Sequence, residues 1–284
     1  MKQPTLLRSV RAELYKALHN KMLWIAIGIG LVMITMDLWE AYEGIRHARE
    51  KVIQWQAEGK DLYLGYSLFR AWIFSCSGTY GAGLLITIWP LLAAMAFGWS
   101  YNNERTSGVY NQVVSRIGIR RYFLSKHIAV FISGGLAHCI PIIINLLAMA
   151  LIYPAWEHPS VLDSTFLSGL ALASPWGFCI AMCGMSFLWG GATACICHCT
   201  GTYLRHGVMV VLVPYALYII IDTVISVYYT LTQTTIFIQW SPRLLGAFFA
   251  TIVNPGWLQF SYLILFTLGS YALGLWQVKK HELV

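Results

Sequence analysis

Long apolar stretches separated by short charged segments dominate the chain. Stretches free of Asp, Glu, Lys and Arg run 22–36, 71–103, 127–156, 164–204, 206–221, 223–242 and 244–278. A helix needs about 20 mostly apolar residues to cross roughly 30 Å of hydrocarbon, and its backbone must satisfy its own hydrogen bonds there. The pattern predicts six membrane-spanning helices, at 22–40, 74–99, 128–153, 172–199, 207–230 and 257–277.

Composition supports a membrane protein and excludes a soluble one. Hydrophobic residues make up 58% of the 284 residues and charged residues 11%, where a soluble domain has about 25% charged residues. The mean hydropathy is +0.62. A chain this poor in polar side chains cannot form a water-soluble globule, a disordered chain or a coiled coil. We predict an all-α polytopic membrane protein forming one transmembrane domain over 1–284.

Lysine and arginine positions predict the orientation of the spans. With six spans, 13 of the 19 basic residues fall on the side that holds both termini, and five of the other six lie in segment 41–71. The positive-inside rule then places both termini in the cytoplasm, which for a bacterial protein means the plasma membrane. The net charge of +7 reflects this orientation, and we expect no nucleic-acid partner.

Two segments on the predicted cytoplasmic side are amphipathic. In 5–21, apolar residues recur at helical spacing, which favours an interfacial helix in the headgroup layer. Segment 101–126 carries five basic residues and one acid, Glu104, together with apolar residues spaced on one helical face. That apolar face needs to be covered by lipid, by the chain's own bundle or by a partner protein.

The segments on the opposite side are less regular. We expect helix within 41–71, where no breaker follows Gly44 before Lys51. The apolar run 244–253 is too short to span and lies between turn signals, which fits a re-entrant or interfacial helix.

At 101–126 the chain resembles a known family. Glu104-Arg105-Thr106-Ser107-Gly108, Ser115, Arg120-Arg121 and Lys126 resemble the loop after the second span in membrane permease subunits of type-2 ABC exporters. There a Glu, a Gly-Thr pair and a Ser-Arg pair recur before the third span. The layout of N-terminal helix and six spans is also similar, although Val109 and Ile117 stand where the family usually has Thr and often has Pro.

The resemblance implies that 101–126 is a coupling segment. In that family it docks onto a separate ATP-binding cassette ATPase subunit, and two permease subunits pair as identical copies or sister chains. Glu104, Gly108 and Arg120 would then lie at or beside the ATPase-docking surface. The family also implies a bacterial source.

The chain lacks its own phosphate-binding loop of the form G-x-x-x-x-G-K-[ST]. Its one Gly-Lys pair, Gly59-Lys60, is followed by Asp61. We therefore expect no enzymatic activity, no cofactor and no metal on this chain, and we place ATP and Mg on the partner.

Two acids lie within the predicted spans, Asp37 and Asp222. Charge within a membrane is costly and often functional. Both residues are candidates for a transport pathway, and the alternative is interfacial solvation or helix pairing.

Cys195-x-Cys197-His198-Cys199 and Gly184-Met185-Ser186 are the other candidate chemical motifs. Successive residues on one helix point in different directions, so packing is favoured over zinc binding or acylation for the cysteines. Ser186 as a protease nucleophile would need a base, and no histidine occurs between 207 and 280.

The sequence thus favours the permease subunit of an exporter for a peptide, lipid or drug-like substrate. The alternative is an ion-coupled secondary transporter or a membrane assembly scaffold that works without ATP.

Overall fold

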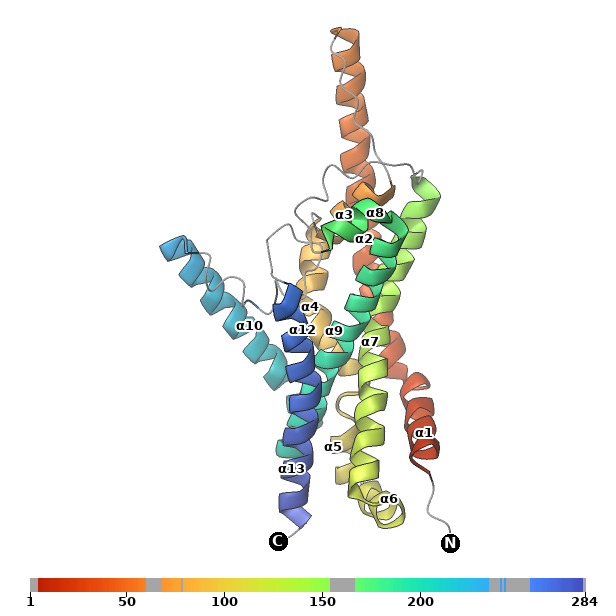
Figure 1. Cartoon of the computed structure of the whole chain (residues 1–284), viewed down its shortest axis with the longest axis vertical. Helices are drawn as coiled ribbons and strands as arrows, with labels where there is room; N and C mark the ends of the chain where they lie inside the picture. The colour runs from red at the N-terminus through yellow and green to blue at the C-terminus, as the bar shows by residue number, and fades with distance from the viewer. Residues whose placement is uncertain are drawn as a thin grey trace.

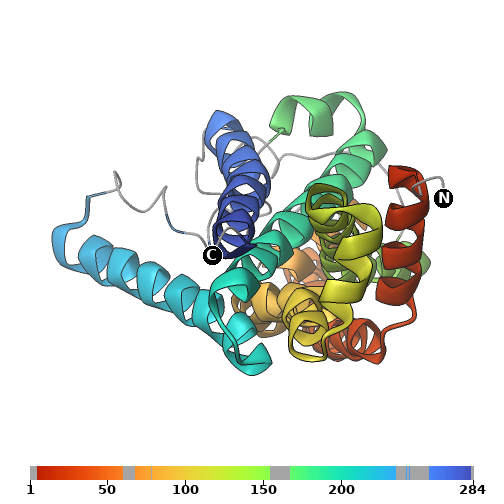
Figure 2. The ribbon, with the colours of Figure 1, turned by 90° about the horizontal axis from the view of Figure 1, so that it is seen from below.

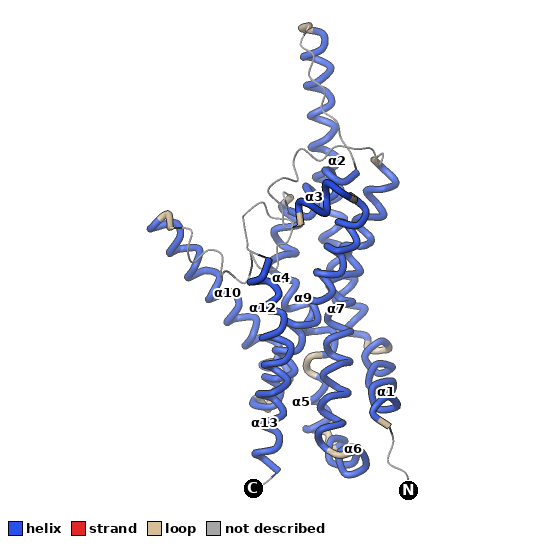
Figure 3. Tube along the Cα trace, viewed as in Figure 1, coloured by secondary structure: helices blue, strands red, loops and turns tan. Residues whose placement is uncertain are grey.

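The computed structural model describes residues 5–59, 68–77, 79–153, 167–234, 241, 243 and 256–282, and within them the chain is helical without strands (Figure 3). The helices are α1 (Leu6–Leu18), α2 (Lys21–Ala57), α3 (Leu68–Ser77), α4 (Tyr80–Phe97), α5 (Ser100–Thr106), α6 (Val109–Ile117), α7 (Ile119–Ile152), α8 (Ser168–Ala173), α9 (Pro175–Tyr203), α10 (Gly207–Thr232), α12 (Gly256–Ile264), the π-helical η2 (Leu265–Gly269) and α13 (Ser270–Glu282).

Six helical segments of this described part are long and apolar enough to cross a membrane. They are Lys21–Ala57, Tyr80–Thr106, Ile119–Ile152, Pro175–Tyr203, Gly207–Thr232 and Phe260–Lys280. The predicted all-helical class and six spans are confirmed, as expected for a multi-pass membrane protein.

Two spans differ in extent from their predicted bounds. α2 continues to Ala57 and projects beyond the other helices at the upper end of Figure 1, because no helix breaker interrupts the charged segment after the apolar part. The predicted 74–99 span is divided, since α3 ends at Ser77 and Thr79 caps a new helix by accepting a hydrogen bond from the Ala82 amide. The predicted helix at 244–253 lies outside the described residues.

Glycines allow α7 and α9 to pack closely at the centre. A Cβ at Gly134 would lie 2.4 Å from the Ala194 Cβ, and a Cβ at Gly190 would lie 2.5 Å from the Gly134 carbonyl oxygen. Small residues let helix backbones approach in this way. A Cβ at Gly30 of α2 would likewise lie 2.7 Å from a ring atom of Pro141 in α7.

α10 stands apart from this bundle. It leans away from the other helices in Figures 1 and 2, and among its residues Val210 and Val211, near its start, are buried. The two ends of the bundle therefore differ: near Val210 α10 touches its neighbours, and further along it diverges from them.

Several segments distant in sequence lie at one end of the molecule. α1, α5, α6 and the last turns of α13 share the lower end of Figure 1, and Figure 2 shows α6 between α1 and α13. The predicted amphipathic segments thus lie together.

Candidate functional site

A buried group of charged side chains lies behind α6 and joins three helices. Lys126 of α7 is fully buried, and its Nζ lies 2.9 Å from Glu13 Oε2 of α1 and 3.0 Å from Glu104 Oε1 of α5. The two glutamate side chains are 6% and 13% exposed. A buried ammonium needs such partners, because an unpaired charge in a low-dielectric interior is strongly unfavourable.

Lys16 and Tyr122 complete this group, which we call the charge cluster (Glu13, Lys16, Glu104, Tyr122 and Lys126). Lys16 Nζ lies 2.7 Å from Glu13 Oε1 and 3.0 Å from Glu104 Oε1. The Tyr122 hydroxyl donates to Glu104 Oε2 at 2.6 Å. The cluster thus contains two ammonium groups and two carboxylates. Each carboxylate forms an ion pair with both Lys16 and Lys126.

Lys16 forms the outer edge of the charge cluster. Partial burial lowers the pKa of Lys16, but hydrogen bonding and charge attraction from Glu13, reinforced by Glu104, outweigh this and raise its pKa above the usual 10.5. Lys16 is therefore charged at neutral pH.

Hydrogen bonds on either side of Glu104 hold α5 to the end of α9 and the residue after it. The Asn102 side chain donates to the Leu204 carbonyl at 2.6 Å, and Arg105 donates to the Thr202 carbonyl at 3.2 Å. Gly108 then adopts φ +77°, with open space around its Cα. Only glycine takes this left-handed conformation freely, and it lets the chain turn from α5 into α6.

The apolar face of α6 is covered by the chain's own bundle. Tyr110 is buried against Tyr101 and Tyr122, while Val113, Val114 and Ile117 are partly buried in the same cluster. The sequence left open whether lipid, the chain's own bundle or a partner protein covers this face, and in the structure the bundle covers it. The polar face remains exposed, and it consists of Asn111, Gln112, Ser115 and Arg116.

The three predicted docking residues therefore lie in different surroundings. Gly108 and Arg120 are exposed, near the two ends of α6. Glu104 instead points into the charge cluster. Sequence reasoning missed Glu13, Lys16, Lys126 and Tyr122 as partners of Glu104. The available signal was a glutamate and a lysine three residues apart in the N-terminal helix.

A histidine pair lies deeper in the bundle and joins α7, α9 and η2. The His127 and His198 Nδ1 atoms are 3.1 Å apart, and His127 Nε2 is 3.0 Å from the Thr267 carbonyl oxygen in η2. Because a carbonyl accepts only, His127 carries its proton on Nε2, and His198 Nδ1 is the donor within the pair. His198 Nε2 is then a buried acceptor.

Asp37 of α2 lies against the start of α4. It is 1% exposed and accepts a 2.7 Å hydrogen bond from the Thr79 hydroxyl. One turn further along α2, Glu40 accepts from the Tyr80 amide at 2.7 Å. Carboxylates suit the amide end of a helix, and both acids lie where they accept hydrogen bonds at the start of α4.

Asp222 is half-buried on α10, and the Ser241 hydroxyl donates to it. Asp222 and Asp37 accept hydrogen bonds from different residues, Ser241 and Thr79. Among the described residues, these hydrogen bonds therefore do not link the two candidate pathway acids to each other.

The cysteine and serine motifs are packed into the bundle. Cys195, Cys197 and Cys199 are buried on α9, and the described residues contain no group of three or more His, Cys, Asp or Glu side chains placed to hold a metal. Ser186 Oγ donates to the Met182 carbonyl, and His138 Nδ1 contacts the Ser186 backbone carbonyl at 2.9 Å. The imidazole therefore does not hold the serine hydroxyl.

Comparison with protein-family models and with curated proteins finds no match for this chain.

Proposed function

We propose that the chain is the permease subunit of an ATP-binding cassette exporter. In this proposal α6 is the coupling helix, and a separate ATPase subunit docks on its exposed polar face. The observation that carries the proposal is the connection of α6 to the bundle: its apolar face packs on α5 and α7, and α5 is anchored by the charge cluster.

This arrangement suits the transmission of force. A displacement of α6 acts on α5 directly through Gly108, and on α1 and α7 through Glu104 with its two lysine partners. The contacts of Asn102 and Arg105 pass the same displacement to the end of α9. Packed interiors transmit strain rather than absorb it, so one helix can move several spans together.

The end of the molecule that holds α6 carries exposed positive charge, which suits an acidic or polar partner surface. The charge cluster neutralises Lys16 and Lys126 internally. Arg8, Arg11, Arg116 and Arg120 remain exposed on α1, α6 and the start of α7. Opposite charge on a partner would steer docking and fix its orientation.

The proposed mechanism places all ATP chemistry on the partner. ATP and Mg bind to the ATPase subunits, whose closure pushes α6, tilts the attached helices and moves a peptide, lipid or drug-like substrate outward between two permease copies or sister chains. The α6 end and both termini face the cytoplasm of a bacterial cell. Glu104 acts as a positioning residue, while Gly108 and Arg120 lie beside the docked surface.

Charge reversal on α6 tests this proposal. Arg116→Glu should reduce co-purification of an ATPase carrying a P-loop and should lower ATP turnover in reconstituted vesicles, while the thermal midpoint stays unchanged. Arg49→Glu, an equally drastic change on the exposed part of α2 at the opposite end, is the matched control. Wild-type co-purification and turnover in Arg116→Glu would refute the docking assignment.

The alternative remains a carrier or scaffold without ATP. A carrier would use intramembrane acids such as Asp37. Transport by the purified chain driven by an ion gradient alone would establish that alternative.

A further inference from the structure

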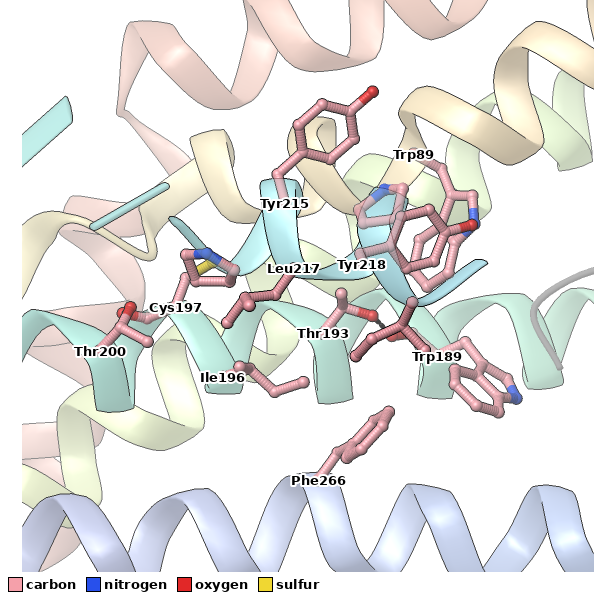
Figure 4. A pocket seen from close by; sticks show the side chains of 13 residues that line it. Trp89, Trp189, Thr193, Ile196, Cys197, Thr200, Tyr215, Leu217, Tyr218 and Phe266 are labelled. Atoms are coloured by element: carbon pink, nitrogen blue, oxygen red, sulfur yellow. Dashed lines mark hydrogen bonds between the residues drawn. The ribbon is translucent and has the colours of Figure 1, made fainter. Parts of the chain in front are cut away.

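A cavity opens where α10 leaves the bundle. It has a volume of about 230 Å³ and lies between α10, α9, α4 and η2. Figure 4 shows Leu217 and Tyr218 of α10 on one side, Thr193 and Ile196 of α9 on the other, and Phe266 facing them from the sixth span. Cys197 of the cysteine motif also lines it.

The lining carries no charged side chain and offers no free hydroxyl from its threonines or from Tyr218. Thr193 donates to the Trp189 carbonyl, and Thr200 contacts the Cys197 and Val210 carbonyls at 2.9 and 3.0 Å. The Tyr218 hydroxyl donates to the Ile86 carbonyl at 3.0 Å. These hydroxyls are committed to the backbone, so a guest with several polar groups would lose its own hydrogen bonds to water and gain few in return.

Size narrows the class of guest further. An apolar cavity of about 150 Å³ is known to stay dry and to bind benzene, so this larger one favours an apolar guest over water. Pockets for drug-sized ligands have about 300–1,000 Å³, which is more than this cavity offers. A flexible hydrocarbon chain fits both limits, because it fills a narrow space one methylene at a time.

The cavity is also accessible from the side that lipid covers. Leu217 and Ile221 line it while remaining 53% and 47% exposed, so it opens on the lateral surface of a membrane-spanning helix. Acyl chains are the material that surrounds such a surface. The benefit of binding relative to bulk lipid comes from contact of the chain with the rings of Trp89, Trp189 and Phe266.

We propose that this cavity is a binding site for one acyl chain of a membrane lipid, inserted between α10 and the bundle. The site selects the hydrocarbon chain and not the headgroup, since its lining has no charged side chain and the hydroxyls of Thr193, Thr200 and Tyr218 bond to backbone carbonyls. The proposal does not require an ATPase partner, so it stands or falls separately from the exporter assignment.

Photolabelling of the full chain in vesicles tests the site. The probe is phosphatidylcholine with a diazirine near the middle of one acyl chain, and peptide mass spectrometry maps the labelled residues. We expect labelling at Leu217 and Ile221 several times stronger than at Val224, which is 62% exposed on the same helix and lies outside the lining. The same diazirine chain on phosphatidylglycerol should give the same ratio.

A filled cavity provides the matched pair of variants. Leu217→Trp should abolish the excess labelling at Ile221, whereas Val224→Trp, two turns along the same helix face, should leave it intact. Thermal unfolding of both variants in detergent shows that each is folded. Equal labelling of lining and non-lining residues, a strong dependence on headgroup, or excess labelling that survives Leu217→Trp would each overturn the proposal.

Discussion

Removal of the central ammonium of the charge cluster gives the sharpest test of its role. Lys126→Met keeps most of the side-chain volume and removes the charge. Glu13 and Glu104 then face each other with Lys16 as their remaining cationic partner, and the Lys16 side chain is 44% exposed. The structure predicts that the two carboxylates destabilise the junction of α1, α5 and α7.

The expected magnitude follows from burial. Breaking a buried ion pair by removing one partner costs about 3–5 kcal/mol, because the other charge is left uncompensated. Lys126 is fully buried and its partners are 6% and 13% exposed, so the change should reach this range. Replacement of all three residues by Lys126→Met, Glu13→Gln and Glu104→Gln should recover much of the loss, since the one charge left in the cluster is that of Lys16, whose side chain is 44% exposed to water.

A surface pair of the same chain supplies the control. Arg46 and Glu43 on α2 form a 2.7 Å ion pair with side chains 51% and 28% exposed, and exposed pairs contribute about 0–1 kcal/mol. The assay is equilibrium unfolding of Lys126→Met and Arg46→Met in the same detergent. A loss in Lys126→Met no greater than that in Arg46→Met, or a triple variant less stable than Lys126→Met, would refute the reasoning.

Three further changes have defined expectations. Gly190→Ala should lower the free energy of unfolding by about 1–3 kcal/mol through overpacking, because its Cβ would meet a backbone oxygen at 2.5 Å. Gly184 lies on the same helix with open space at its Cβ position. Gly184→Ala should therefore leave the free energy of unfolding unchanged in the same denaturation assay. Asp37→Ala should cost about 1 kcal/mol by removing the shorter of two hydrogen bonds of the Thr79 hydroxyl, which keeps the Ser75 carbonyl at 3.0 Å, and an unchanged thermal midpoint with lost transport would assign Asp37 to the pathway instead. Gly108→Ala should cost about 1–2 kcal/mol for its left-handed backbone and should speed amide exchange in α6, whereas wild-type exchange would show that the turn is not needed.

Hydropathy was sufficient for the architecture because lipid imposes a strict rule on each span. The starts of α9 and α10 lie close to the predicted 172 and 207, since Pro175 and the charged residues before Gly207 mark them. The predicted helix bounds were wrong where a capping side chain sets the boundary. Thr79 looks ordinary in an apolar run, yet its side chain caps the start of a new helix.

The candidate site was predicted less completely, for a physical reason. The spacing in α1 gave no reason to expect that Glu13 is buried, whereas the structure buries it with Ser9 and Ala17, and α1 packs on α7. The pairing of Glu13 with Lys126, 113 positions along the chain, supports that burial together with the nearby Lys16. Pairing between distant charges leaves no periodic signal in a single sequence, and neither does the contact between His127 and His198.

The most direct test of the exporter proposal is photo-crosslinking from the exposed face of α6. A photoreactive amino acid at Ser115, introduced into the full chain in its native membrane, should form an adduct with an ATPase that carries a P-loop, and ATP should change its yield. The same amino acid at Arg49 should form none. Adducts from Ser115 to lipid alone, or modification of a Ser115→Cys variant by a membrane-impermeant maleimide added outside intact cells, would contradict the account.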